Sequence, residues 1–108
     1  GTATLQTAAP VIQALQELHG AGKLTAAVCA APLVLEAAGL LAGKRVTAYP
    51  TVRDRLGGLW VEAPVVQDGT IITGSGPATA LPFALKVLAY LAGDEVADNV
   101  AKGMLAAF

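Results

Sequence analysis

The sequence predicts a three-layer α/β fold, in which helices cover both faces of a mainly parallel sheet. Segments with helical periodicity alternate along the chain with short apolar runs that are typical of strands. The run at residues 23–29 has no polar alternation, which favours a strand buried on both faces. The 108 residues are enough for one small domain.

The first predicted element is a helix over residues 7–23. Its apolar residues recur every three or four positions, Pro10 fits its first turn, and Thr7 is expected to cap it. His19 lies in the last turn, where the helix dipole favours it. We expect no catalytic role for His19, because the chain has no second histidine.

The middle of the chain alternates between strands and helical segments. After the strand at 23–29, a helix is predicted over residues 31–39, with Pro32 in its first turn. A second strand follows at 44–50, and residues 51–58 are predicted to form a helical turn that ends in glycines.

The C-terminal part is predicted to contain a hairpin and two helices. The sequence "QDG" at 67–69 separates two β-branched runs, and Pro64 is expected at a bend or a strand edge. A long apolar helix is predicted over residues 76–93, with Pro82 in its opening turns. Asp94 is expected to cap a last helix over residues 94–108. About four strands are predicted in total, and no strand precedes the first helix.

Composition excludes several classes of function. A net charge of −1 gives no basic face for a nucleic acid, and no apolar stretch is long enough for a membrane helix. One cysteine and one histidine cannot complete a metal site. A single cysteine without a secretory cue favours the cytoplasm. Hydrophobic residues make up 55% of the chain, which predicts apolar faces that need a partner.

The stretch "LTAAVCAAP" places the single cysteine, Cys29, at the end of a predicted strand and just before a helix. This is the layout of a nucleophile elbow, and the small residues at 30 and 31 allow the tight turn that it needs. The amides after Cys29 and the helix start favour a thiolate, which makes the residue reactive and oxidisable. The alternative is a small buried hydrophobic residue in a scaffold.

A second turn, "TGSGPAT" at 73–79, again joins a strand to a helix through glycines and a proline. Two such turns at the carboxyl ends of adjacent parallel strands would line one crevice, where open α/β sheets bind ligands. No lysine follows the glycines, so a phosphate-binding P-loop is disfavoured. The glycines serve either a binding role or only the tight turn.

Three stretches, "AAVCAAP", "VTAYPTVRDRL" and "VVQDGTIITGSGPATALPFALKVL", together resemble the ThiJ/PfpI superfamily in order and spacing. The resemblance covers nearly the whole chain. It implies a flavodoxin-like three-layer sandwich related to class I glutamine amidotransferases. It also implies a homodimer, no cofactor, and Cys29 as the elbow cysteine.

Two features of that family are absent from the chain. Family members carry a glutamic acid that hydrogen-bonds the thiolate and a Pro-Gly-Gly turn that contributes an oxyanion amide. The carboxylates of Glu17, Glu36 and Glu62 are expected to be surface charges rather than substitutes. We therefore expect residues 1–108 to be the C-terminal portion of a single domain. Its N-terminal strands and helix are missing from this chain and are its expected partner.

Some relatives place a histidine beside or just after the cysteine, where this chain has Tyr49 and Ala30. Because a thiol peptidase needs such a base, Cys-His peptidase chemistry is disfavoured. Tyr49 either donates a hydrogen bond in the crevice or packs as an aromatic.

The resemblance implies a cofactor-independent glyoxalase or deglycase that acts on small reactive carbonyl compounds. Cys29 is the expected nucleophile, and Ala30, Tyr49 and Gly74 are the expected binding residues. The alternative is an oxidative-stress sensor or holdase chaperone that is switched by oxidation of Cys29.

Overall fold

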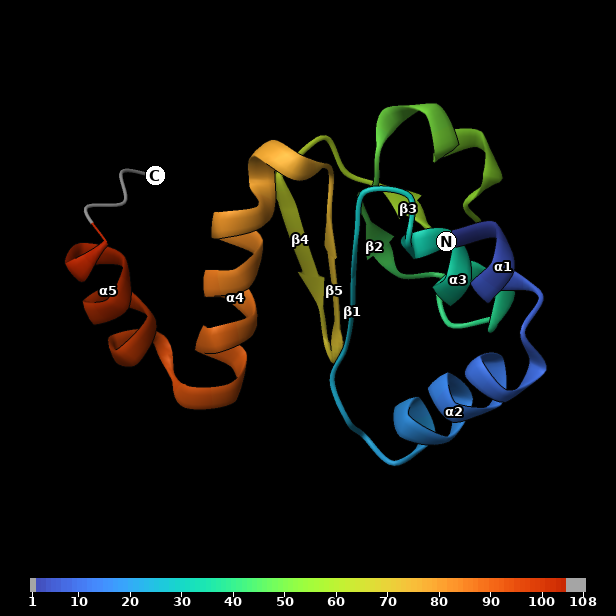
Figure 1. Ribbon diagram of the computed structural model, residues 1–108, viewed down its shortest axis with the longest axis horizontal. Helices are drawn as coiled ribbons and strands as arrows, with labels where there is room; N and C mark the ends of the chain where they lie inside the picture. Colours follow the sequence, from blue (N-terminus) through green and yellow to red (C-terminus); the bar gives the residue numbers. More distant parts are fainter. Residues whose placement is uncertain (1, 105–108) are drawn as a thin grey trace.

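A three-stranded mixed sheet forms the middle of the molecule (Figure 1). Strand β1 (Thr25–Val28) pairs in parallel with β5 (Ile71–Gly74), and β5 pairs antiparallel with β4 (Val65–Asp68). A second sheet consists of β2 (Arg45–Val46) and β3 (Leu59–Trp60), which are parallel. The prediction that two adjacent parallel strands each end in a turn is therefore confirmed for β1 and β5.

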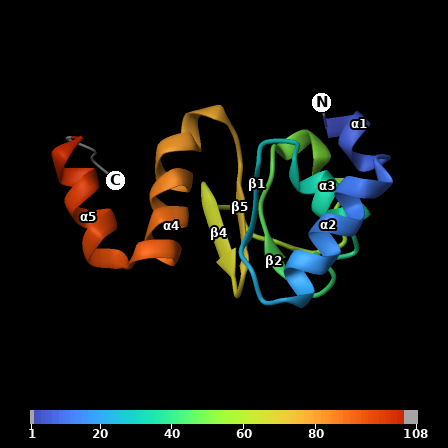
Figure 2. The same ribbon diagram turned by 60° about the horizontal axis from the view of Figure 1, so that its bottom comes forward.

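Helices lie on both sides of these strands, which gives the three predicted layers (Figure 2). Helices α1, α2 and α3 lie on one side, α4 covers the other, and α5 packs outside α4. The computed structural model describes residues 2–104. Within that range, no helix is long and apolar enough to cross a bilayer. The helical elements are α1 (Thr2–Gln6), α2 (Ala9–Gly20), α3 (Pro32–Ala37), η1 (Pro50–Arg55), η2 (Pro77–Thr79), α4 (Ala80–Ala92) and α5 (Asp94–Gly103), η1 and η2 being 3₁₀-helices.

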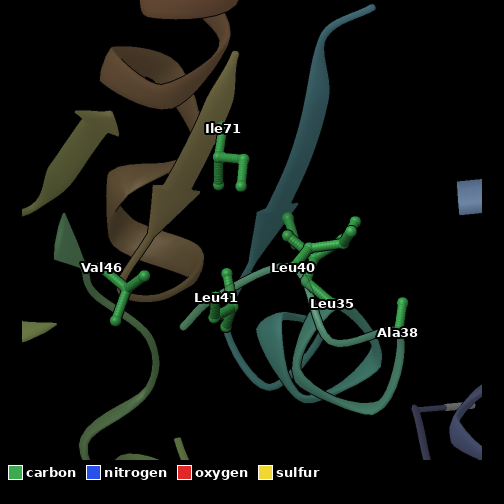
Figure 3. Packing of buried hydrophobic residues seen from close by; sticks show 7 residues of the cluster. Leu35, Ala38, Leu40, Leu41, Val46 and Ile71 are labelled. Atoms are coloured by element: carbon green, nitrogen blue, oxygen red, sulfur yellow. The ribbon is translucent and has the colours of Figure 1, made fainter. Parts of the chain in front are cut away.

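The main core lies between the sheet and α3 (Figure 3). Leu41, Val46 and Ile71 in it are 0% exposed. Burying one such aliphatic side chain contributes about 1.5–3 kcal/mol, so this cluster holds β1, β2 and β5 in fixed relative positions. Its buried members are Ala27, Leu35, Ala38, Leu40, Leu41, Val46 and Ile71.

The predicted hairpin is confirmed between β4 and β5. Its two-residue loop is Gly69–Thr70, and Gly69 has a φ of 61°. A positive φ at the first loop position is the requirement of a type II′ turn, and glycine meets it without steric cost. Pro64 lies in a bend directly before β4, as predicted.

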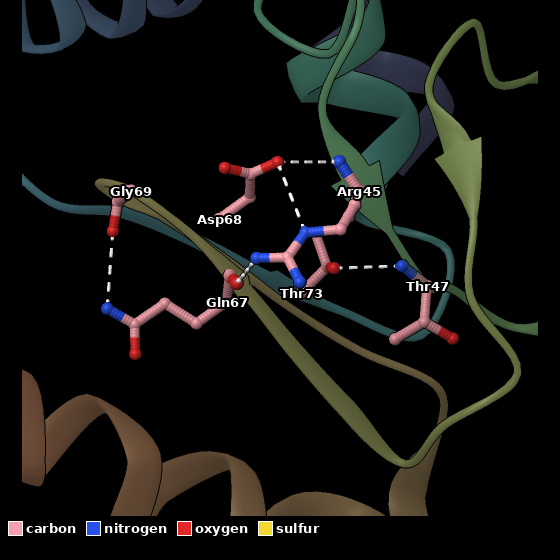
Figure 4. Close-up of polar contacts among 6 residues, drawn as sticks. All are labelled: Arg45, Thr47, Gln67, Asp68, Gly69 and Thr73. Carbon is pink, nitrogen blue, oxygen red and sulfur yellow. Dashed lines mark hydrogen bonds and ion pairs between the residues drawn. The ribbon is translucent and has the colours of Figure 1, made fainter.

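Side chains of the hairpin connect the two sheets (Figure 4). The Oγ1 of Thr73 in β5 accepts a buried hydrogen bond of 2.9 Å from the backbone amide of Thr47. Asp68 Oδ2 accepts the backbone amide of Arg45 at 2.9 Å and lies 3.6 Å from Nε of the same residue. The hydrogen bond from the Arg45 amide holds the pKa of Asp68 below its ordinary value.

Two predicted helix caps are wrong. The N-cap of α2 is Ala8, while Thr7 donates its hydroxyl to the carbonyl of Thr4, the residue three positions earlier in α1. A short helix therefore precedes α2, and its last turn binds the Thr7 hydroxyl that was predicted to cap α2. The N-cap of α5 is Gly93, with a φ of 98°, and Asp94 is already helical. The predicted end of that last helix, at residues 105–108, lies outside the described residues.

Strand number and burial also differ from the prediction. The described residues form five strands rather than about four, because the short β3 was not anticipated. Strand β1 is not buried on both faces, since Ala26 is exposed between the buried Thr25 and Ala27. Among residues 2–104, β1 pairs along one edge only, with β5.

Candidate active site

Cys29 occupies the turn between β1 and α3 with a backbone φ of 64°. It is the only non-glycine residue among residues 2–104 whose φ is positive. An L-residue in this left-handed region costs about 1–2 kcal/mol, so the surrounding structure has to hold it there. The sharp strand-to-helix turn predicted from "AAVCAAP" is thus a turn with stored backbone strain.

Two backbone hydrogen bonds fix Cys29 in this conformation. Its amide donates to the carbonyl of Gly74, the last residue of β5, at 3.0 Å. Its carbonyl accepts the amide of Tyr49, just before η1, at 2.7 Å. Both bonds join segments that the core already positions, and the side chain of Cys29 is left partly buried.

The amide of Ala30 directly follows the cysteine. It donates no hydrogen bond to any acceptor in the described part of the chain. The next amide, that of Ala31, donates to the carbonyl of Val28 at 3.1 Å. An amide without a protein partner beside a nucleophile is a donor of the kind that stabilises an oxyanion. The methyl group of Ala30 packs beside a second small cluster of buried residues, Leu33, Ala48 and Val52.

The second turn, after β5, is held by its own threonine. Thr79 Oγ1 accepts the amide of Gly76 at 3.1 Å and donates to the carbonyl of the same glycine at 2.7 Å. A Cβ on Gly74 would lie 2.9 Å from Cδ1 of Phe83 and 3.0 Å from Cγ2 of Val28. Glycine is needed at position 74 for packing, whereas the rest of the turn faces a pocket.

That pocket has a volume of about 450 Å³ and lies beside the two turns. Residues 47–50, which follow β2, and 75–79, which follow β5, form two of its walls. A third wall contains Trp60 and Glu62. The first two walls include or adjoin the residues that hydrogen-bond the backbone of Cys29, so the pocket is a neighbour of the cysteine.

The four predicted site residues do not all lie in one place. Tyr49 is 44% exposed and lines the pocket. Cys29, Ala30 and Gly74 are not among its lining residues. Cys29 and Ala30 form the adjoining turn, and Gly74 is buried beneath it.

The three carboxylates near Cys29 in sequence differ in their surroundings. Glu17 is exposed on α2, as predicted. Glu36 is partly exposed and accepts the amide of Gly57 at 2.9 Å, a contact on the surface of the protein. Glu62 is exposed but lines the pocket, where it accepts the indole NH of Trp60 at 2.7 Å. None of them hydrogen-bonds Cys29 within the described residues.

Sequence reasoning therefore missed the third wall of the pocket. The sequence predicts Glu62 as a surface charge, and no motif connects Trp60 or Glu62 with Cys29. The one available signal is that Trp60 and Glu62 stand at positions i and i+2 of an extended segment, which puts both side chains on the same face. Among residues 2–104, no group of three His, Cys, Asp or Glu side chains is arranged to hold a metal ion.

Residues 1–90 match the DJ-1/PfpI family. The chain belongs to that family. Protein dj-1beta of Drosophila melanogaster is 43% identical over 97 residues, which are 87% of this chain and 52% of that protein. The crystal structure of Drosophila melanogaster DJ-1beta superimposes with a TM-score of 0.93, at 40% identity, over 99% of this chain and 59% of that one. The predicted superfamily and its flavodoxin-like α/β fold are thus confirmed.

A third relative carries an activity in its name. The glutathione-independent glyoxalase DJR-1.2 of Caenorhabditis elegans is 39% identical over 97 residues, which are 86% of this chain and 52% of that protein. This chain spans about half the length of these fly and nematode relatives.

Proposed function

We propose that the protein containing this chain is a cofactor-independent glyoxalase or deglycase for small reactive carbonyl compounds, with Cys29 as its nucleophile. The observation that carries the proposal is the left-handed backbone of Cys29 at the end of a parallel strand. A protein retains such strain where the position of one side chain matters. The relative named as a glutathione-independent glyoxalase supports the same chemistry.

The first step uses residues of this chain. The Cys29 thiolate adds to the aldehyde carbon of the substrate, a C–S bond forms, and the electron pair of the C=O π bond moves to oxygen. The amide of Ala30, which has no acceptor in the described residues, donates to that oxyanion. Tyr49 lies where the rest of the substrate extends into the pocket. Gly74 supports the turn by accepting the Cys29 amide.

The hemithioacetal then needs a base that moves a proton from the former aldehyde carbon to the neighbouring ketone carbon. Glu36 is engaged with the amide of Gly57, and Glu17 is on the exposed side of α2. We therefore assign the base to a glutamic acid in an N-terminal portion of the same domain, of which residues 1–108 are the C-terminal portion. Proton transfer gives a thioester, and water releases the 2-hydroxy acid and regenerates the thiol. The protein acts as a cytoplasmic homodimer.

The test is turnover of methylglyoxal to lactate by the full-length protein and its Cys29→Ser variant. The wild type is expected to produce lactate without glutathione, and Cys29→Ser is expected to lose at least a hundredfold in kcat/KM. Cys29→Ser retains the backbone hydrogen bonds of the turn, so circular dichroism should stay unchanged. Equal rates in the two proteins, or no turnover in either, would contradict the proposal.

The alternative, a sensor or holdase switched by oxidation, gives a different result in the same pair of proteins. It predicts protection of a client protein from aggregation after peroxide treatment of the wild type but not of Cys29→Ser. Cys29 is only partly buried, and this alternative requires its sulfur to be reached by small oxidants. Protection without turnover would replace the enzyme proposal with this one.

A further inference from the structure

The pocket beside Cys29 contains one formal charge. Apart from Glu62, its walls consist of alanine, proline and glycine, the aromatic rings of Tyr49 and Trp60, and uncharged hydroxyl side chains. A carboxylate in a partly apolar pocket repels anions and tolerates neutral or cationic molecules. The charge composition of the pocket therefore bears on which carbonyl compounds can enter.

The carboxylate of Glu62 has a defined position. Its Oε2 accepts the indole NH of Trp60 at 2.7 Å, and the Trp60 ring packs against the cluster of Leu33, Ala48 and Val52. The guanidinium of Arg53 lies 5.3 Å from the centroid of the same ring, outside the pocket lining. Trp60 is thus held by packing and by a cation–π contact, and it in turn holds Glu62 at the pocket wall.

We propose that Glu62 makes this pocket the specificity site of the enzyme, which accepts neutral α-ketoaldehydes and rejects those that carry a carboxylate. The inference rests on the proposed function. At a separation of roughly 5–6 Å, two like charges weaken binding by roughly threefold to a hundredfold, depending on the local dielectric constant. Arg53 opposes Glu62 at longer range, so the expected discrimination is about tenfold.

Two five-carbon substrates that differ in charge test this inference. In full-length protein, kcat/KM for neutral 2-oxopentanal should exceed that for 4,5-dioxopentanoate by about tenfold, mainly through KM. In Glu62→Gln the ratio should fall to about one, because glutamine still accepts the Trp60 indole hydrogen but carries no charge. Glu17→Gln, which removes an exposed carboxylate far along the chain on α2, is the matched control and should leave the ratio unchanged.

A binding measurement keeps the inference testable without turnover. In the Cys29→Ser background, each compound is titrated while the indole NH signal of Trp60 is followed by NMR. The neutral compound should bind about tenfold tighter, and Glu62→Gln should remove that difference. Equal binding of the two compounds, no binding of either, or a difference that survives Glu62→Gln would overturn the inference. Loss of turnover with the binding difference intact would instead contradict only the proposed function.

Discussion

The region around Cys29 and the pair formed by α4 and α5 are packed very differently. Around the cysteine, Leu41, Val46 and Ile71 are 0% exposed, and both flanking strands are tied to the same core. In contrast, α4 and α5 each have one buried residue, and Leu91, near the end of α4, is 68% exposed. The described residues thus supply enough packing to hold a strained turn, but they leave an apolar surface on the outer helices.

The largest expected effect comes from truncating the same residue type in both regions. Leu41→Ala should lower the free energy of unfolding by about 3–4 kcal/mol, because it leaves a cavity in the core. Leu91→Ala should change it by less than about 0.5 kcal/mol. Urea denaturation of the full-length protein measures both. A similar loss in the two variants would show that Leu91 is buried in the complete protein and would end the contrast.

A second test concerns how closely the backbone segments approach at the start of β2 and β3. A Cβ on Gly58 would lie 2.8 Å from the carbonyl oxygen of Lys44 and 3.0 Å from that of Leu41. Gly58→Ala should therefore destabilise the protein by about 2 kcal/mol, as overpacking of a core does. Gly20, at the end of α2, has open space around it, and Gly20→Ala should be neutral or slightly stabilising. Thermal denaturation in which Gly58→Ala matched the wild type would contradict this packing.

The strain at Cys29 can be measured with two small substitutions. Cys29→Gly should be more stable than Cys29→Ala by about 0.5–1 kcal/mol, because glycine adopts a positive φ without steric cost. The matched control is Ala26, in β1 and without a positive φ, where Ala26→Gly should be destabilising instead. Chemical denaturation would argue against backbone strain if glycine were unfavourable at both positions.

The smallest effect is expected at the far end of the hairpin. Because the pKa of Asp68 is lowered in the folded state, its ionised form adds stability above its ordinary pKa of about 3.9. That contribution is lost as the pH falls through the lowered value. The stability difference between wild type and Asp68→Asn should be present at pH 6 and shrink towards pH 2. A difference that did not depend on pH would show that Arg45 binds Asp68 without regard to charge.

Local signals were sufficient for the turns and the hairpin. Glycine at 69 is required by a two-residue loop, and an apolar strand followed by Cys29 and a proline predicted a tight strand-to-helix turn. Both features depend on a few adjacent residues, which one sequence contains in full. The predicted cap of α2 is wrong because the neighbouring element was not recognised. Thr7 is hydrogen-bonded to a short preceding helix that the hydrophobic periodicity does not reveal.

The pocket could not be derived in the same way. Its walls come from three segments that are not adjacent in the sequence. One of them is positioned by a hydrogen bond from the backbone amide of Thr47 to the hydroxyl oxygen of Thr73, which connects the two sheets. No pattern in the sequence indicates that Glu62 faces the same space as Tyr49. The roles of Cys29, Ala30, Tyr49 and Gly74 stay predictions, and the Cys29→Ser variant addresses the first of them.

The two hydrogen bonds that clamp the main chain of Cys29 have one more consequence. Because the main chain is held in place, alkylation, oxidation or acylation of the sulfur should leave β1 and β5 in their positions. Covalent reagents therefore report on access and charge next to the sulfur rather than on rearrangement of the chain. The rates at which electrophiles of different charge modify Cys29 would consequently report the charge of the neighbouring pocket.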